Sequence, residues 1–369
     1  MKIGIITFHF AYNYGAMIQA YAMQEHLRMM GHEPYIIDYA PEYHTSYYSK
    51  GRTWKHCFSG KGLRIFWRIY LKLFRDPAGK RSKNFTRFMK KNFRLYPYDP
   101  NDDMSSFDCI LLGSDQIWNQ NITDNRFDGP YYGDGFKCRV FSYAASNRAT
   151  ELGDKEKDIY REKLTNLSFI GVREPRLQQL LQPLTDKHVY LNADPTILAG
   201  VSVYNKFDLR RPVVRKYVVV YETENHEEVQ QMAKDYAKNL GASVIVLLEN
   251  TDYRYGREYD QSASPEKFLA YIKNAECIFT SSFHGTVLSI LFKKKFFSIR
   301  QGNSKDIRLE SILEQVGLLD RFISMNANPI EGTIDYDLVD EHLTMMRTSS
   351  QQYLEWAIRG INEFEIARQ

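Results

Sequence analysis

A histidine and a glycine lie between a predicted strand and a predicted helix in the C-terminal half of the chain. Residues 276–280 have the apolar pattern of a short buried strand, and residues 286–292 form an apolar run typical of a buried helix. Ser282 and Gly285 belong to the turn, where helix amides and the dipole's positive end attract phosphate or carboxylate. His284 adds a donor that titrates near neutral pH. This stretch predicts chemistry on an anion, with a helix cap or buried core histidine as the alternative.

Two further loops carry candidate base and stacking groups. Ligands of open α/β sheets bind at the carboxyl ends of the strands. Residues 113–119 follow a predicted buried strand, where Asp115 can accept protons from sugar hydroxyls and Trp118 can stack on a sugar. A helix N-cap is the alternative for Asp115. Residues 13–15 stand at a helix start where glycine permits close backbone approach, although a simple turn explains the same pattern.

Two arginines are candidates for holding the anion. Arg173 follows a predicted buried strand, and a guanidinium there can bind carboxylate or phosphate in bidentate fashion. Helix capping or an ion pair with Glu174 is the competing interpretation. Arg308 lies in the predicted helix after the loop 301–304, and we expect it to point into the same cleft as His284.

The composition fits a globular protein of two domains. At 369 residues the chain is long enough for two separate cores, and 26 Tyr and 22 Phe suit ring-lined clefts as well as cores. The four cysteines are scattered without a metal-ligand or disulfide pattern, so no metal site is predicted. The chain starts without a signal-peptide pattern and has no apolar run of membrane-spanning length. These features predict a cytoplasmic protein.

The net charge of +4 hides a strong asymmetry. Residues 50–94 hold fifteen Lys and Arg and one acid, so they carry +14 and the rest of the chain carries −10. Within them, residues 63–75 combine apolar and basic side chains at helical spacing. Such a helix can bind the inner face of an anionic membrane, and a solvated helix packed on its own domain is the alternative. Nucleic-acid binding is not predicted, because no recognition motif accompanies the charge.

Alternating strand and helix patterns predict two α/β domains. A polar stretch at residues 198–215 separates two series of predicted strands. We expect an N-terminal domain at 1–205, which carries the basic insertion 50–94, and a C-terminal domain at 206–345. The final segment, 346–369, is expected to be a closing helix that crosses back. Short apolar strands indicate parallel sheets, and a cleft between the two domains is expected.

Six short motifs, taken in order, resemble the polysaccharide pyruvyl transferase family. Each motif is weak alone, but the set is specific and runs from about residue 1 to residue 320. The basic segment 50–94 matches none of them. The motifs are residues 13–21, residues 113–119, residues 142–146, Val172 to Glu174, Asp194 to Thr196 and residues 282–286.

The resemblance implies a GT-B-like fold with two Rossmann-like domains that face each other across a cleft. It implies transfer of a pyruvyl group from phosphoenolpyruvate to hydroxyls of a cell-surface glycan precursor, lipid-linked or nucleotide-activated, and such a reaction needs no redox cofactor. By motif position, His284 matches the family's functional histidine, and Arg173 and Arg308 match basic positions that hold phosphoenolpyruvate.

Together with the residue patterns, the resemblance predicts three groups of site residues. Catalysis is assigned to His284 and Asp115. Donor binding is assigned to Arg173, Arg308, Ser282 and Gly285. Acceptor binding is assigned to Asn13, Tyr14, Gly15 and Trp118.

Two other functions stay open. A GT-B glycosyltransferase that uses a nucleotide sugar would have the same fold, and a fold does not fix the chemistry. A non-catalytic protein that binds glycans or anions would bind a ligand without turnover. The identity of the donor distinguishes the glycosyltransferase from the pyruvyl transferase, and the presence of turnover distinguishes either enzyme from a non-catalytic binding protein.

Overall fold

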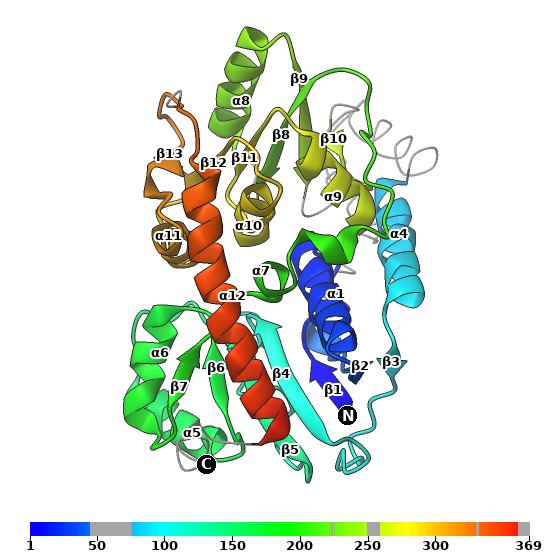
Figure 1. The fold of residues 1–369 in the computed structure, drawn as a ribbon, viewed down its shortest axis with the longest axis vertical. Coiled ribbons are helices and arrows are strands. Elements are labelled where there is room, and N and C mark those ends of the chain that lie inside the picture. The colour runs from blue at the N-terminus through cyan, green and yellow to red at the C-terminus, as the bar shows by residue number, and fades with distance from the viewer. Residues whose placement is uncertain (45–75, 223, 225, 249–258, 330–331, 361–369) are drawn as a thin grey trace, which may run out of the picture.

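The computed structural model describes residues 1–44, 76–222, 224, 226–248, 259–329 and 332–360. These residues form two α/β domains, each built on a parallel sheet, and a long helix that runs along both (Figure 1). The prediction of two Rossmann-like domains is confirmed. The predicted basic helix at residues 63–75 lies outside the described residues.

The N-terminal domain contains a seven-stranded sheet in the order β3-β2-β1-β4-β5-β6-β7. All neighbouring strands are parallel. The order reverses between β1 and β4, so the chain leaves these strands toward opposite faces and a crevice opens at their carboxyl ends. The strands are β1 (Lys2–Ile6), β2 (Glu33–Ile37), β3 (Leu95–Tyr96), β4 (Cys109–Asp115), β5 (Arg139–Ala145), β6 (Ile170–Val172) and β7 (Val189–Leu191).

Helices and short 3-10 turns connect these strands. The first helix begins where the side chain of Asn13 accepts a hydrogen bond from the amide of Ala16, and Gly31 follows its end with a φ of 84°. The helices are α1 (Tyr14–Met29), α4 (Pro77–Asn92), α5 (Asp154–Leu164), α6 (Pro175–Leu181) and α7 (Pro195–Ala199). The 3-10 turns are η4 (Gly129–Tyr132), η5 (Gln182–Leu184) and η6 (Val201–Tyr204).

Helix α4 is the part of the basic segment that the structure describes. Phe85 and Phe88 face the core, whereas Lys83, Arg87 and Lys90 are exposed on the other side. This amphipathic division explains why a strongly basic stretch still forms a packed helix.

The C-terminal domain contains a six-stranded parallel sheet in the order β10-β9-β8-β11-β12-β13. Its order reverses between β8 and β11, which places a second crevice there. The strands are β8 (Tyr217–Glu222), β9 (Ser243–Leu248), β10 (Tyr259–Asp260), β11 (Cys277–Thr280), β12 (Phe296–Arg300) and β13 (Phe322–Ser324). The helices are α8 (Glu227–Asn239), α9 (Pro265–Asn274), α10 (Phe283–Leu291) and α11 (Asp306–Gln315), with the 3-10 turn η7 (Leu319–Arg321).

Helix α12 (Tyr336–Arg359) crosses from the C-terminal to the N-terminal domain (Figure 1). It begins before the expected residue 346. At the C-terminal domain Asp340 pairs with Lys293 at 2.6 Å. At the N-terminal domain the hydroxyl of Tyr353 donates to the carbonyl of Ser142 at 2.5 Å. The helix therefore fastens the two domains to each other.

One apolar core runs through the contact between the domains. It includes α1 and α7 on one side and α9, α10 and α11 on the other. The ring of Tyr14 stacks on Phe268 at 4.5 Å between centroids. The domains are thus packed closely against each other along α1. Within the described residues, no helix combines the length and hydropathy needed to cross a membrane.

Candidate active site

His284 lies in the first turn of α10 and reaches the N-terminal domain. The helix begins at Phe283, earlier than the predicted residue 286, because Ser282 caps it by accepting a hydrogen bond from the amide of Gly285 at 3.4 Å. His284 is 5% exposed, and its Nε2 lies 3.4 Å from Oδ2 of Asp194. The histidine is therefore an interdomain residue that faces a carboxylate.

The other ring nitrogen of His284 lies against Gly15. A methyl group at Gly15 would come within 2.1 Å of Nδ1 of His284, so only glycine permits this approach at the start of α1. Gly285 has a comparable role, because a methyl group there would lie 2.3 Å from Oγ1 of Thr280. Gly15 and Gly285, which were both predicted as site residues, allow close packing against His284 and Thr280 in the structure.

We expect Gly15→Ala to lower the free energy of unfolding by about 1–3 kcal/mol, because the added methyl must displace the His284 ring. Denaturant unfolding measures this change. Gly153→Ala is the matched control, because a methyl group there meets nothing closer than 3.5 Å. Equal stability of the two variants would contradict the close contact.

Asp194 is the centre of the site, although the sequence indicated it only as part of a family motif and no role was predicted for it. Its Oδ1 accepts hydrogen bonds from the amide and hydroxyl of Thr196 at 3.0 and 2.7 Å. Its Oδ2 accepts hydrogen bonds from Arg173 at 2.7 Å and Ser114 at 3.3 Å, and it faces His284. Burial favours a raised pKa for Asp194, but His284, Arg173 and the Thr196 amide outweigh it and hold the pKa well below its usual range. Asp194 is thus an anion at every physiological pH.

The charge of Arg173 is matched inside the protein. Its Nε donates to Glu174 at 3.0 Å, its Nη1 to Asp194 at 2.7 Å and its Nη2 to Ser146 at 3.0 Å. Asp115 lies 3.8 Å away. Burial acts to lower the pKa of Arg173, but these carboxylates raise it above its usual range. The ion pair with Glu174, which the sequence left as an alternative, is present.

Arg308 is a buried cation whose Nε has no hydrogen-bond acceptor among the described residues. Burial lowers its pKa to about 9, and the neighbouring charges of Arg148 and Arg173 act in the same direction. Arg308 borders a cavity of about 10 Å³ between the domains, which has room for about one water molecule. A buried positive charge of this kind is suited to an anion. The cavity is also lined by Arg173, Asn192, Asp194, Phe283 and Gln315.

Asp115 ends β4 at the crevice of the N-terminal domain. Its backbone has a φ of 72°, and its carbonyl oxygen accepts hydrogen bonds from the amides of Ile117 and Ser146 at 2.8 and 3.0 Å. Residues 116–128 contain no helix, so Asp115 caps none in the structure. The carboxylate lies beside the Arg173 network, where it can accept a proton from a hydroxyl bound at this edge.

Three predicted acceptor residues have structural contacts instead. Trp118 is fully buried, donates from Nε1 to the carbonyl of Tyr131 at 2.9 Å and stacks on Tyr132. The prediction that its ring is available to a sugar is wrong, because both faces belong to the core. Tyr14 is also fully buried and donates to the carbonyl of Ala263 at 3.2 Å. Asn13 is the α1 cap described above.

We expect Trp118→Phe to reduce stability by about 1–3 kcal/mol through the lost hydrogen bond and ring volume. Denaturant unfolding gives this value, with Trp356→Phe as a control at a partly buried position. A variant of unchanged stability that loses glycan binding would restore the stacking role.

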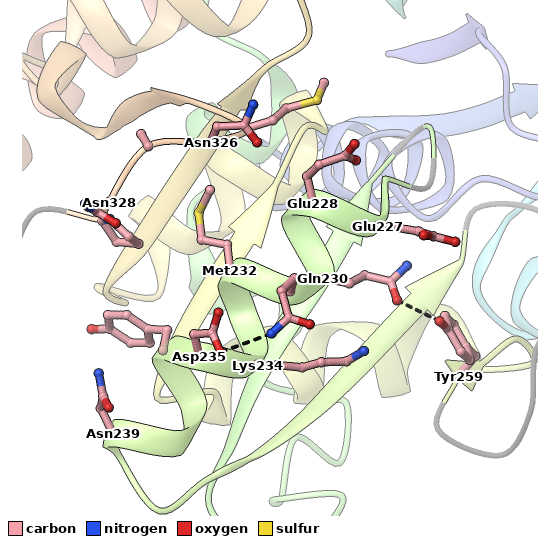
Figure 2. A pocket seen from close by; sticks show the side chains of 15 residues that line it. Glu227, Glu228, Gln230, Met232, Lys234, Asp235, Asn239, Tyr259, Asn326 and Asn328 are labelled. Carbon is pink, nitrogen blue, oxygen red and sulfur yellow. Dashed lines mark hydrogen bonds between the residues drawn. The ribbon is translucent and has the colours of Figure 1, made fainter.

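A broad hollow on the C-terminal domain lies apart from these residues. It measures about 930 Å³ and lies between α8 and residues 325–329. Figure 2 shows Met232, Asp235 and Asn326 on its walls. None of the predicted site residues lines it. Within the described residues, no group of three or more His, Cys, Asp or Glu is arranged to hold a metal ion.

Several solved structures have a distantly similar fold. The UDP-GlcNAc 2-epimerase of Neisseria meningitidis, bound to UDP-GlcNAc, is 12% identical with a TM-score of 0.47, and the match covers 97% of this chain and 94% of that one. The S. aureus MnaA structure with UDP is 10% identical with a TM-score of 0.48, and the match covers 95% of this chain and 92% of that one. UGT89C1 of Arabidopsis thaliana is 10% identical with a TM-score of 0.46, and the match covers 97% of this chain and 98% of that one. This level of similarity carries no inference about activity. No curated protein matches the chain.

A family model identifies the chain more directly. The model described as polysaccharide pyruvyl transferase matches residues 13–303. This range includes His284, Asp194, Arg173 and Asp115, and it ends just before Arg308. The chain therefore belongs to the polysaccharide pyruvyl transferase family and is a transferase.

Proposed function

We propose that the protein transfers the pyruvyl group of phosphoenolpyruvate to two hydroxyls of a sugar in a cell-surface polysaccharide precursor, with release of phosphate. The observation that carries this proposal is the buried Arg308, whose Nε has no acceptor among the described residues, close to the Arg173 network in a chain of this family. A donor with a carboxylate and a phosphate would supply the missing negative charge.

The reaction needs a proton at the methylene carbon of the enol phosphate and a base for the sugar hydroxyls. Protonation makes the adjacent carbon electrophilic, one hydroxyl adds to it, and a second hydroxyl then displaces phosphate to close the ketal. His284 is proposed to act on the donor phosphate, with Asp194 holding its ring at 3.4 Å. Asp115 is proposed as the base on the acceptor side. The proposal needs no cofactor.

The donor site must widen for this reaction. Pockets for small ligands are usually about 300 Å³ or larger, whereas the cavity beside Arg308 measures about 10 Å³. We therefore propose that the donor enters when the domains move apart along α1 and that the described arrangement is the closed one. Partial closure around the bound donor would exclude water from the enol phosphate.

The test is incubation of the purified protein with phosphoenolpyruvate and pooled lipid-linked or nucleotide-activated glycans. We expect acceptor-dependent phosphate release and a product heavier by one pyruvyl ketal, both absent from His284→Ala. Turnover of a nucleotide sugar without ketal formation would support the glycosyltransferase instead. Binding of phosphoenolpyruvate with no turnover of any glycan would support a non-catalytic protein.

We also propose that residues 50–94 hold the enzyme at the inner face of a membrane that carries a lipid-linked acceptor. In support, Lys83, Arg87 and Lys90 are exposed on α4 and have no ion-pair partner among the described residues. Sedimentation with vesicles that contain anionic lipid, at low and high salt, tests this idea. Binding that does not weaken with salt would contradict it.

A further inference from the structure

A second carboxylate–histidine pair lies at the crevice of the C-terminal domain. Glu222 is the last residue of β8, one residue beyond the point where Tyr221 pairs with Thr280 of β11. Strand order reverses between these two strands, and α8 and α10 follow them. Ligands of open α/β sheets bind outside the carboxyl ends of the strands at such a point. Glu222 therefore lies beside the start of α10, which carries His284.

The geometry of the pair leaves one histidine nitrogen available. Oε1 of Glu222 lies 2.8 Å from Nδ1 of His226, and the amide of His226 donates to Oε2 of Glu222 at 3.4 Å. The Glu222 side chain is 2% exposed, whereas that of His226 is 22% exposed. A buried carboxylate that holds Nδ1 fixes the ring and leaves Nε2 for proton transfer.

The charged groups around the pair connect it to the anion site. Nε2 of His226 lies 4.0 Å from Glu224, and Glu224 pairs with Lys305. Lys305 precedes the first residue of α11, and Arg308 lies in the first turn of the same helix. The hydrogen bond to Lys305 is the main cause of the lowered pKa of Glu224, and burial is the main cause for Arg308; the charge of Arg148, from the N-terminal domain, acts in the same direction on both. The pair is therefore linked through Glu224 and Lys305 to the start of the helix that carries Arg308.

Glu222 has a raised pKa because it is buried. Burial raises the pKa of Glu222 to about 7; the charge of Glu228 in the first turn of α8 adds to this rise, and His226 opposes it. The Glu222 carboxyl therefore gains or loses its proton near neutral pH.

We propose that His226, positioned by Glu222, delivers the proton to the methylene carbon of the enol phosphate donor. The inference rests on the proposed function. A C–H bond forms as the N–H bond at Nε2 breaks, and the electron pair of the enol double bond makes the new bond. Asp115 accepts the proton of the hydroxyl that adds to the adjacent carbon, and exchange with water then returns that proton to solvent and restores the proton on His226. The proton of the second hydroxyl leaves with phosphate.

This assignment separates the two histidines by position. His284 is enclosed between Gly15 and Asp194, and its ring does not line the cavity beside Arg308. His226 is more exposed and comes from the other side of the C-terminal sheet. When the domains move apart to admit the donor, His284 is proposed to act on its phosphate and His226 on its methylene carbon.

The test compares His226→Gln, Glu222→Gln and the control Glu227→Gln, which changes an exposed acid in the first turn of α8. We expect His226→Gln to lower kcat for ketal formation about 100-fold, with KM for phosphoenolpyruvate changed less than about threefold. Glu222→Gln should lower kcat about tenfold and move the alkaline limb of its pH profile. In D2O, deuterium should enter the product methyl group more slowly in both variants, and Glu227→Gln should behave as the wild type.

The outcomes are separable. If the wild type forms the ketal and His226→Gln keeps its kcat, the inference is overturned while the proposed function stands. If the wild type forms no ketal with any acceptor, both are overturned. A purely structural role would lower thermal stability and raise KM without moving the pH limb, and this also overturns the inference.

Discussion

The variant Arg308→Met is expected to lose donor binding and to gain stability. Wild-type Arg308 is buried with an Nε that has no acceptor among the described residues, and its pKa is lowered to about 9. An apolar side chain of similar length removes this buried charge, so the free energy of unfolding should rise by about 1–3 kcal/mol at pH 7. KM for phosphoenolpyruvate should rise about 100-fold or more, because a charge-assisted contact to the anion is lost. Denaturant unfolding and steady-state kinetics measure the two effects.

The sign of the stability change follows from the lowered pKa. The folded protein binds the Arg308 proton less tightly than the unfolded chain does, so burial of the charge destabilises the fold below about pH 9 and this penalty is relieved at higher pH. Arg210→Met is the control, because Arg210 is an exposed arginine paired with Asp208. A loss of stability in Arg308→Met would mean that the guanidinium has a structural partner, and unchanged KM would remove Arg308 from the donor site.

The elements that position the site were largely predictable, because parallel strands buried on both faces have continuous apolar runs. The run before Gly113 and the run at residues 276–280 correspond to β4 and β11. The strands β3, β7, β10 and β13 were not predicted, since edge strands of two or three residues carry too little pattern. Helix α10 starts earlier than predicted because the cap of Ser282, and not the apolar run, sets its first residue.

The partners of the site residues were less predictable, because they come from distant parts of the chain. Arg173 and Glu174 are adjacent, and their ion pair was a foreseeable alternative. Asp194 joins Ser114, Arg173 and His284 from both domains, and no local pattern indicates that convergence. The missing acceptor of Arg308 is equally invisible in sequence. Trp118 was misassigned because a tryptophan in a loop looks the same whether its ring faces a ligand or the core.

Asp194→Asn is expected to impair both folding stability and turnover. The variant keeps the shape of the side chain but leaves the buried Arg173 without its closest counter-charge, which lies at 2.7 Å in the wild type. Removal of one partner from a buried ion pair typically costs about 3–5 kcal/mol. His284 loses the carboxylate that faces its Nε2 at 3.4 Å. We therefore expect kcat for ketal formation to fall on the order of 10²–10⁴-fold.

The pH dependence of stability distinguishes a lost charge from lost packing. The pKa of Asp194 is held well below its usual range in the folded protein, so its carboxylate stabilises the fold above about pH 4 and this contribution is lost as the pH falls toward the folded pKa. The stability gap between wild type and Asp194→Asn should therefore narrow below about pH 4. A gap that is constant with pH would instead indicate a packing defect.

A double variant tests whether the loss of stability in Asp194→Asn comes from the broken Arg173–Asp194 ion pair. If the penalty of Asp194→Asn comes from an unmatched Arg173, then Arg173→Met combined with Asp194→Asn should lose less stability than the two single variants added together. The coupling should exceed about 1 kcal/mol in denaturant unfolding. Additive losses would show that Glu174 alone neutralises Arg173, in which case Asp194 would serve mainly His284. Turnover in the double variant should stay low in either case, because the carboxylate facing His284 is absent from both Asp194 variants.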